Sequence, residues 1–143
     1  MRIVIDTSAL ISLCAGGILE LAICSLNFIL PTRVHNEIIG LSRNSTFEGN
    51  CAKKILQFIG NEIPVIGASK LAKEGELECA YLANDIPDVH FLITDDSVAL
   101  EKLEKICQKH IRFSTIIVYA LCIKGKITKR KAYLILEEIR VKR

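Results

Sequence analysis

The sequence MRIVIDTS, residues 1–8, opens the chain and decides its fold. Residues 2–5 are a short β-branched apolar run, which predicts a strand buried on both faces. The run stops at Asp6, so a carboxylate follows the carboxyl end of the strand, where open α/β sheets bind their ligands. A second run of this kind, residues 90–93, leads into Thr94-Asp95-Asp96. If the two strands are parallel neighbours, their acids meet at one edge of the sheet.

Strands and helices are predicted to alternate along the whole chain. Short apolar runs near residues 28–30, 63–66 and 111–113 predict further strands, and apolar stripes at helical spacing predict the helices between them. This alternation predicts an α/β fold, a three-layer α/β/α arrangement around a short, mostly parallel sheet of four to five strands. The 143 residues contain no linker, repeat or low-complexity segment, so we expect one domain over residues 1–143.

Composition narrows the class of protein. Hydrophobic residues make up 50% of the chain, but no apolar run is long enough to span a bilayer without interruption. Asp6 also interrupts the pattern of a secretory leader, so we expect a cytoplasmic protein with no membrane partner. The six cysteines form no Cys-x-x-Cys pair and have no histidine beside them, which indicates neither a zinc site nor a disulfide framework.

The charges are unevenly distributed along the chain. Residues 100–143 contain 12 lysines and arginines against 4 glutamates, whereas residues 1–99 have a net charge of −5. Such a dipole suits a hydrolase of polyanions, in which acids hold cations and a separate basic surface holds phosphates. The candidate residues for binding the phosphates of such a polyanion are Lys124, Lys126, Lys129, Arg130 and Lys131. A solvated helix face explains the same charges equally well.

Two further acids occupy the apolar faces of predicted helices. Glu37 falls within the stripe formed by Val34 and Ile38, and an unpaired charge on a buried face is costly. Glu76 shares a face with small residues, whereas Glu78 lies about 200° further round the helix and is expected to face water. In the last third, Ser114 is expected to cap the helix that follows it.

Four acidic positions at one edge of a sheet require compensation. Two like charges about 4 Å apart repel by about 4 kcal/mol at an effective dielectric of 20, so the cluster needs protons or cations. Oxygen ligands without cysteine or histidine favour Mg²⁺ or Mn²⁺. Each acid also has a structural explanation. Asp6 and the Asp95-Asp96 pair can open helices, and Glu37 and Glu76 can pair with lysines.

These motifs resemble those of the PIN-domain nucleases, whose VapC-type toxins are small single-domain proteins. The likeness spans nearly the whole chain: Ile5-Asp6-Thr7-Ser8-Ala9-Leu10 is similar to the opening motif, Glu37 to the second acid, Gly75-Glu76-Leu77-Glu78 to a Gly-Glu-x-Glu run, and Thr94-Asp95-Asp96 to the Thr-x-Asp motif. The resemblance implies that Asp6, Glu37, Glu76 and Asp96 are catalytic and bind the metal together with Asp95. It also implies supporting roles for Ser8 and Thr94. Ser114 stands where a subset of the family has glycine.

The resemblance implies a metal-dependent endoribonuclease that uses Mg²⁺ or Mn²⁺ to hydrolyse RNA phosphodiester bonds. It further implies the toxin of a toxin-antitoxin pair, an antitoxin partner and a homodimer. The alternative is a PIN-like module that binds RNA or a protein without nuclease activity. A phosphatase of the haloacid-dehalogenase type would need Asp-x-Asp after the first strand, where this chain has Asp6-Thr7-Ser8.

Overall fold

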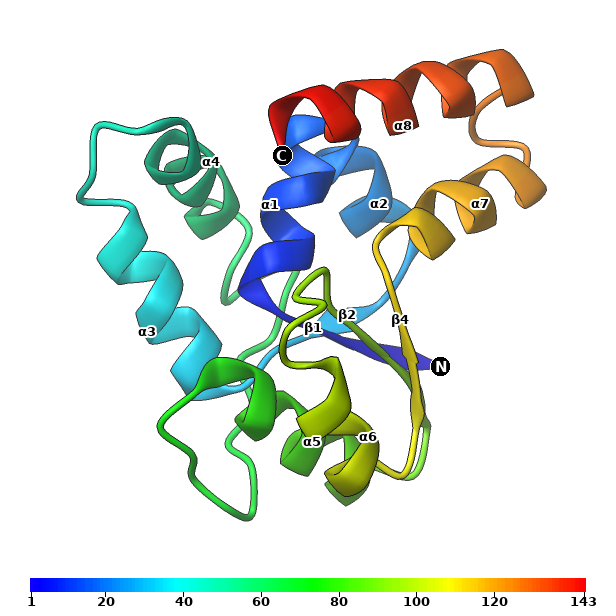
Figure 1. Cartoon of the computed structure of the whole chain (residues 1–143). Coiled ribbons are helices and arrows are strands. Elements are labelled where there is room, and N and C mark those ends of the chain that lie inside the picture. Colours follow the sequence, from blue (N-terminus) through cyan, green and yellow to red (C-terminus); the bar gives the residue numbers. More distant parts are fainter.

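The computed structural model describes all 143 residues and contains one four-stranded sheet, in which every pair of neighbouring strands is parallel (Figure 1). The strands are β1 (Arg2–Ile5), β2 (Phe28–Ile29), β3 (Val89–Ile93) and β4 (His110–Arg112), and their order is β2-β1-β3-β4. The predicted α/β class and parallel sheet are therefore confirmed. The opening strand lies in the interior of the sheet, between β2 and β3.

Eight helices surround the sheet. They are α1 (Thr7–Ala15), α2 (Leu19–Ser25), α3 (Thr32–Leu41), α4 (Phe47–Leu56), α5 (Gly75–Asp85), α6 (Leu100–Ile106), α7 (Thr115–Ile123) and α8 (Lys129–Lys142). In Figure 1 α1, α2, α7 and α8 lie above the sheet, and α5 and α6 lie below it. This gives the three layers expected from the sequence. Helices α3 and α4 pack against each other at one side of the molecule.

The sequence suggested a further strand at residues 63–66, and this strand is not formed. The segment makes only two isolated parallel bridges, one between Leu30 and Val65 and one between Ile59 and Ile63. The backbone N–H of Leu30 donates to Pro64 at 3.2 Å, and that of Ile66 donates to Leu30 at 2.9 Å. Because Pro64 has no N–H of its own, the ladder cannot extend through it, and the segment only borders the edge of the sheet.

Strands β1 and β2 are buried apart from the half-buried Arg2, which explains their apolar sequence, whereas His90 of β3 and both ends of β4 are exposed. Val4, Ile5 and Leu92 are fully buried within a single core cluster. No single helix is long and apolar enough to cross a membrane. Helices α1 and α2 reach that length and composition only as a pair, and they are bent by 118° relative to each other.

The register of β1 and β3 positions the candidate site. Ile5 pairs with Ile93, and the backbone N–H of Asp6 donates to the Ile93 carbonyl at 3.1 Å. The two strands therefore end side by side, and Asp6 and Thr94 emerge at the same edge of the sheet. This is the neighbourhood that the sequence predicted for its first and last acidic motifs.

Candidate functional site

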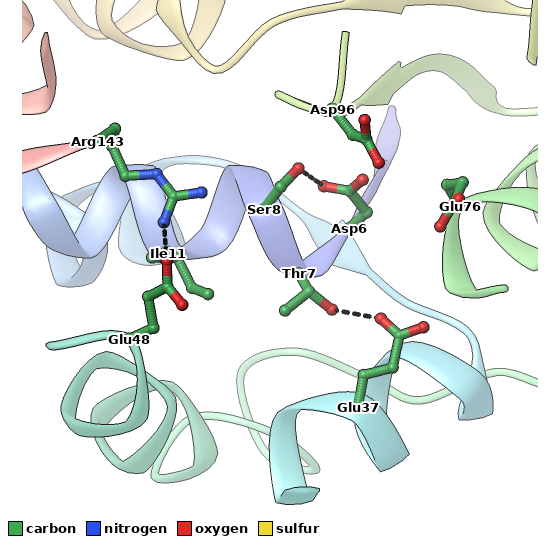
Figure 2. Close-up of a pocket in the computed structure, with 9 residues that line it drawn as sticks. All are labelled: Asp6, Thr7, Ser8, Ile11, Glu37, Glu48, Glu76, Asp96 and Arg143. Atoms are coloured by element: carbon green, nitrogen blue, oxygen red, sulfur yellow. Dashed lines mark hydrogen bonds and ion pairs between the residues drawn. The ribbon is translucent and has the colours of Figure 1, made fainter. Parts of the chain in front are cut away.

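A cavity of about 210 Å³ lies at the carboxyl end of β1 (Figure 2). Its walls come from residues far apart in the sequence: Asp6, Thr7, Ser8, Ile11, Glu37, Glu48, Glu76, Asp96 and Arg143. All four acids predicted to be catalytic line this one space, which we call the acidic cavity. They come from four separate places in the fold: the end of β1, helices α3 and α5, and the loop after β3.

Asp6 is the most buried of these acids, with 4% of its surface exposed. Its Oδ1 accepts hydrogen bonds from the Ser8 hydroxyl at 2.8 Å and from the Ala9 backbone N–H at 3.0 Å. Its Oδ2 accepts one from the Thr94 hydroxyl. Asp6 thus caps α1, which is the structural role that the sequence allowed for it. It also presents its carboxylate to the cavity.

Burial raises the pKa of Asp6 to about 6, because removal from water penalises the ionised form. The hydrogen bonds from Thr94, Ala9 and Ser8 favour the carboxylate and oppose this effect, and the charge of Asp95 adds to it. Near neutral pH Asp6 is therefore mostly ionised, although its burial makes the ionised form costly. A bound cation would offset this cost.

The hydroxyls of Ser8 and Thr94 join Asp6 to the loop after β3. Ser8 Oγ donates to Asp6 and accepts the backbone N–H of Asp95 at 2.9 Å. Thr94 Oγ1 likewise donates to Asp6 and accepts the backbone N–H of Asp96 at 3.1 Å. Each hydroxyl therefore connects the first acid to the last acidic motif.

Glu37 is held by two donors from other elements. Its Oε2 accepts the Thr7 hydroxyl at 3.0 Å, and its Oε1 accepts the backbone N–H of Gly75 at 2.9 Å. A Cβ at position 75 would lie 2.5 Å from Oε1, so only glycine fits there without moving the carboxylate. The sequence allowed a lysine as the partner of Glu37. Its partners are instead Thr7 and Gly75.

Glu76 lines the cavity, whereas the expectation that Glu78 faces water is wrong. Glu78 is 2% exposed, and its Oε2 accepts the backbone N–H of Ala72 at 3.4 Å. The helical spacing identified one inward face, but α5 packs against α3, α6, β1 and β3, and the segment before the helix covers Glu78. Two faces of α5 are therefore buried rather than one.

The pKa of Glu76 is raised, first by partial burial and then by the negative charges of Glu74, Asp96 and Glu37. A hydrogen bond from its own backbone N–H partly offsets these effects. The repulsion from Asp96 and Glu37 indicates that carboxylates of three elements act on one another across the cavity. A cation or proton in the cavity would reduce this repulsion.

The two neighbouring aspartates of the loop point to different places. Asp96 lines the acidic cavity, and its Oδ1 accepts the backbone N–H groups of Val98 at 3.1 Å and Ala99 at 3.2 Å. Asp95 does not line that cavity. Its carboxylate accepts the backbone N–H of Ser114 at 2.7 Å and the Ser114 hydroxyl at 2.5 Å. Ser114 therefore uses its hydroxyl to bind Asp95 and does not cap α7 with it.

The carboxylates suit a hard cation by their chemistry, because every acidic oxygen donor is of the kind that Mg²⁺ and Mn²⁺ prefer. No three His, Cys, Asp or Glu side chains in the chain stand close enough together to enclose a metal ion. Mg²⁺ commonly keeps several waters and binds through only one or two carboxylates, so it does not require such a cage. An ion held in this way would use one or two of the four carboxylates that line the acidic cavity, Asp6, Glu37, Glu76 and Asp96.

The five basic residues predicted to bind RNA do not line the acidic cavity. Lys124, Lys126, Lys129, Arg130 and Lys131 are exposed, form no ion pair, and lie around the turn between α7 and α8. Helix α8 has 14 residues and is about 20 Å long at 1.5 Å per residue. Its other end lies near α1 (Figure 1) and is followed by Arg143, which lines the acidic cavity.

Sequence reasoning missed four residues of the cavity wall, namely Thr7, Ile11, Glu48 and Arg143. The hydroxyl of Thr7 binds Glu37, and a guanidinium nitrogen of Arg143 lies 3.5 Å from a carboxylate oxygen of Glu48 (Figure 2). Thr7 lay within the quoted opening motif and carried a detectable signal. Glu48 and Arg143 carried none, because nothing in a single sequence indicates that positions 95 residues apart meet.

Comparisons with known proteins add no relative. No family model matches the chain, and neither the curated proteins nor the solved structures contain a match to it.

Proposed function

We propose that the chain is a PIN-like, Mg²⁺- or Mn²⁺-dependent endoribonuclease that hydrolyses RNA phosphodiester bonds. The observation that carries the proposal is the convergence of Asp6, Glu37, Glu76 and Asp96 from four parts of the fold onto one cavity. A fold does not require such a convergence, because each acid alone would be more cheaply placed in water. Enzymes concentrate carboxylates in this way to bind cations and to tune proton transfer.

Each acid has a separate task in the proposed reaction. Mg²⁺ or Mn²⁺, when bound, would supply activation of a water molecule and stabilisation of the leaving oxygen. Asp6 and Asp96 are the principal candidates to hold it, because the Thr94 hydroxyl donates to the Asp6 carboxylate and accepts the backbone N–H of Asp96. Glu37 is fixed by Thr7 and Gly75 and would orient the water shell of the ion. Glu76, with its raised pKa, is the carboxylate best suited to accept a proton.

The substrate would approach with its phosphates on the basic surface. The unpaired cations around the α7–α8 turn suit the RNA backbone at a distance from the cavity, whereas Arg143 is the one cation within the cavity wall. The resemblance to VapC-type toxins extends the proposal to a toxin-antitoxin pair, with an antitoxin partner and a homodimer.

The test is incubation of the purified chain with a mixed tRNA and rRNA pool, with Mn²⁺, with Mg²⁺ or with EDTA. We expect cleavage that EDTA stops and that Asp6→Asn abolishes. Glu104→Gln is the matched control, because Glu104 is exposed, unpaired and remote from the cavity. Absence of cleavage with either metal at high protein concentration would overturn the nuclease and favour a module that only binds RNA or protein.

A further inference from the structure

We propose that Asp95 is a positioning residue that fastens the loop after β3 to the start of α7 and so fixes Asp96 in the acidic cavity. The proposal rests on the proposed function for its effect on metal binding, but its structural part can be tested separately. It assigns Asp95 a task different from that of the neighbouring acid, although the two are adjacent in the sequence.

Both carboxylate oxygens of Asp95 are used by one residue. Oδ1 accepts the backbone N–H of Ser114 at 2.7 Å, and Oδ2 accepts its hydroxyl at 2.5 Å. Ser114 is 1% exposed, so both of its donor groups are shielded from water, whereas Asp95 is half-buried. Short hydrogen bonds to an ionised acceptor are stronger than bonds between neutral groups, and a pair of them also fixes orientation. A carboxylate held in this way is poorly placed to bind a metal.

The direction of the side chain agrees with this assignment. Asp95 lines a second cavity, next to the acidic one, together with Ser12, Ile139, Arg140 and Lys142. It is absent from the wall of the acidic cavity, which Asp96 does line. The loop thus turns one carboxylate toward the other acids and the next one toward α7 and α8.

The backbone of Asp95 is tied to the site while its side chain is tied to α7. Its N–H donates to Ser8 Oγ at 2.9 Å, and Ser8 Oγ donates to Asp6. The N–H of Asp96 donates to Thr94 Oγ1, which also donates to Asp6. Without the bonds to Ser114, the loop keeps its contacts with β1 and β4 but has no anchor on α7. The position of Asp96 is then less restricted.

The test is a double-mutant cycle with Asp95→Asn, Ser114→Ala and the double variant, each titrated with Mn²⁺ by calorimetry. Removal of a residue that orients a ligand typically weakens metal binding by about 10- to 100-fold. We expect each single variant to bind Mn²⁺ about tenfold more weakly than the unmodified chain. The double variant should bind Mn²⁺ no more weakly than the single variant with the lower affinity. If Asp95 is itself a ligand, Asp95→Asn weakens binding while Ser114→Ala leaves it within twofold, and the proposal is overturned.

Amide hydrogen exchange in the metal-free protein separates this proposal from the proposed function. We expect Asp95→Asn and Ser114→Ala to raise exchange at Asp96 and Ala99, whose amides donate to Thr94 Oγ1 and to Asp96 Oδ1, by similar factors, whether or not the protein cleaves RNA. Unchanged exchange at these amides in both variants would overturn the positioning role. If Ser114→Ala does not fold, Ser114→Gly replaces it. Both variants keep the backbone donor and remove the hydroxyl.

Discussion

The backbone N–H of Gly75 donates to Oε1 of Glu37 at 2.9 Å, and a side chain at position 75 would begin 2.5 Å from that oxygen. The first residue of α5 therefore determines where the carboxylate from α3 can lie. The backbone of Gly75 is not in the left-handed region, so the requirement for glycine arises from this close approach alone.

Gly75→Ala is expected to displace Glu37 and to lower the rate of RNA cleavage by about tenfold or more, equivalent to about 1.4 kcal/mol of transition-state stabilisation. Cleavage rate and melting temperature are measured together. Gly67→Ala is the matched control, because a Cβ there meets no atom within 4 Å. Adding Glu37→Asp to Gly75→Ala shortens the displaced side chain and should restore part of the activity. Full activity in Gly75→Ala would contradict a role for the position of Glu37.

Asp6→Asn is expected to stabilise the fold at neutral pH. The pKa of Asp6 is raised from its ordinary 3.8 to about 6, so the folded chain binds the proton more tightly than the unfolded chain. The protonated form therefore adds to the free energy of unfolding at low pH. This contribution, about 3 kcal/mol, is lost as the pH rises from about 4 to about 6. Urea unfolding at pH 4 and 7.5 measures this loss. The loss of stability between these two pH values should be smaller in Asp6→Asn and unchanged in Glu104→Gln.

The affinity for Mn²⁺ should depend on pH through the same group. The ion binds the carboxylate and not the carboxylic acid, so affinity is expected to fall by about tenfold per pH unit below about 6. Calorimetric titrations at pH 5, 6 and 7.5 measure the dependence. A constant affinity over this range would mean that Asp6 does not bind the ion.

Glu76→Gln is expected to abolish cleavage with little change in melting temperature, because Glu76 is partly exposed and its charge is repelled by neighbouring acids. Glu78→Gln should leave the rate nearly intact, since its carboxylate binds the backbone of Ala72 and does not line the acidic cavity. Rates are compared at equal concentrations of folded protein. The reverse result would assign the chemistry to Glu78.

Replacement of Lys129, Arg130 and Lys131 by Gln should weaken RNA binding and flatten its salt dependence. The slope of log affinity against log salt should fall by about 0.7 to 0.9 for each phosphate that is no longer neutralised. Binding is measured in the Asp6→Asn background, which removes cleavage. Arg140→Gln with Lys142→Gln is the comparison, because these two cations are already paired with Glu137 and Glu138. An unchanged slope in the triple variant would leave these residues as a solvated surface.

The sequence was most informative for features that depend on the pattern within a single strand or helix. Residues 2–5 and 90–93 predicted neighbouring parallel strands, and the acids that follow them do lie at one edge. The helical spacing correctly placed Glu76 toward the cavity. It failed for Glu78 because the calculation assumes a single buried face, and only the tertiary packing of α5 creates a second.

The two aspartates of the loop show a different limit. No periodicity applies to a loop, so nothing in Asp95-Asp96 indicates which carboxylate turns inward. The choice depends on Ser114, 19 residues further on, and becomes visible only when α7 is in place. The ion pair of Glu48 and Arg143 depends in the same way on how α4 and α8 meet.

The interior position of β1 has a consequence for how the chain folds. Strand β1 pairs with β3, and the bond from Thr94 to Asp6 spans 88 residues. Contacts between residues so distant in the sequence form slowly, because the entropy of closing the intervening loop is lost before the pairing is gained. We therefore expect the helices between β1 and β3 to acquire structure early. During that interval Asp6 remains in water as an ordinary ionised aspartate.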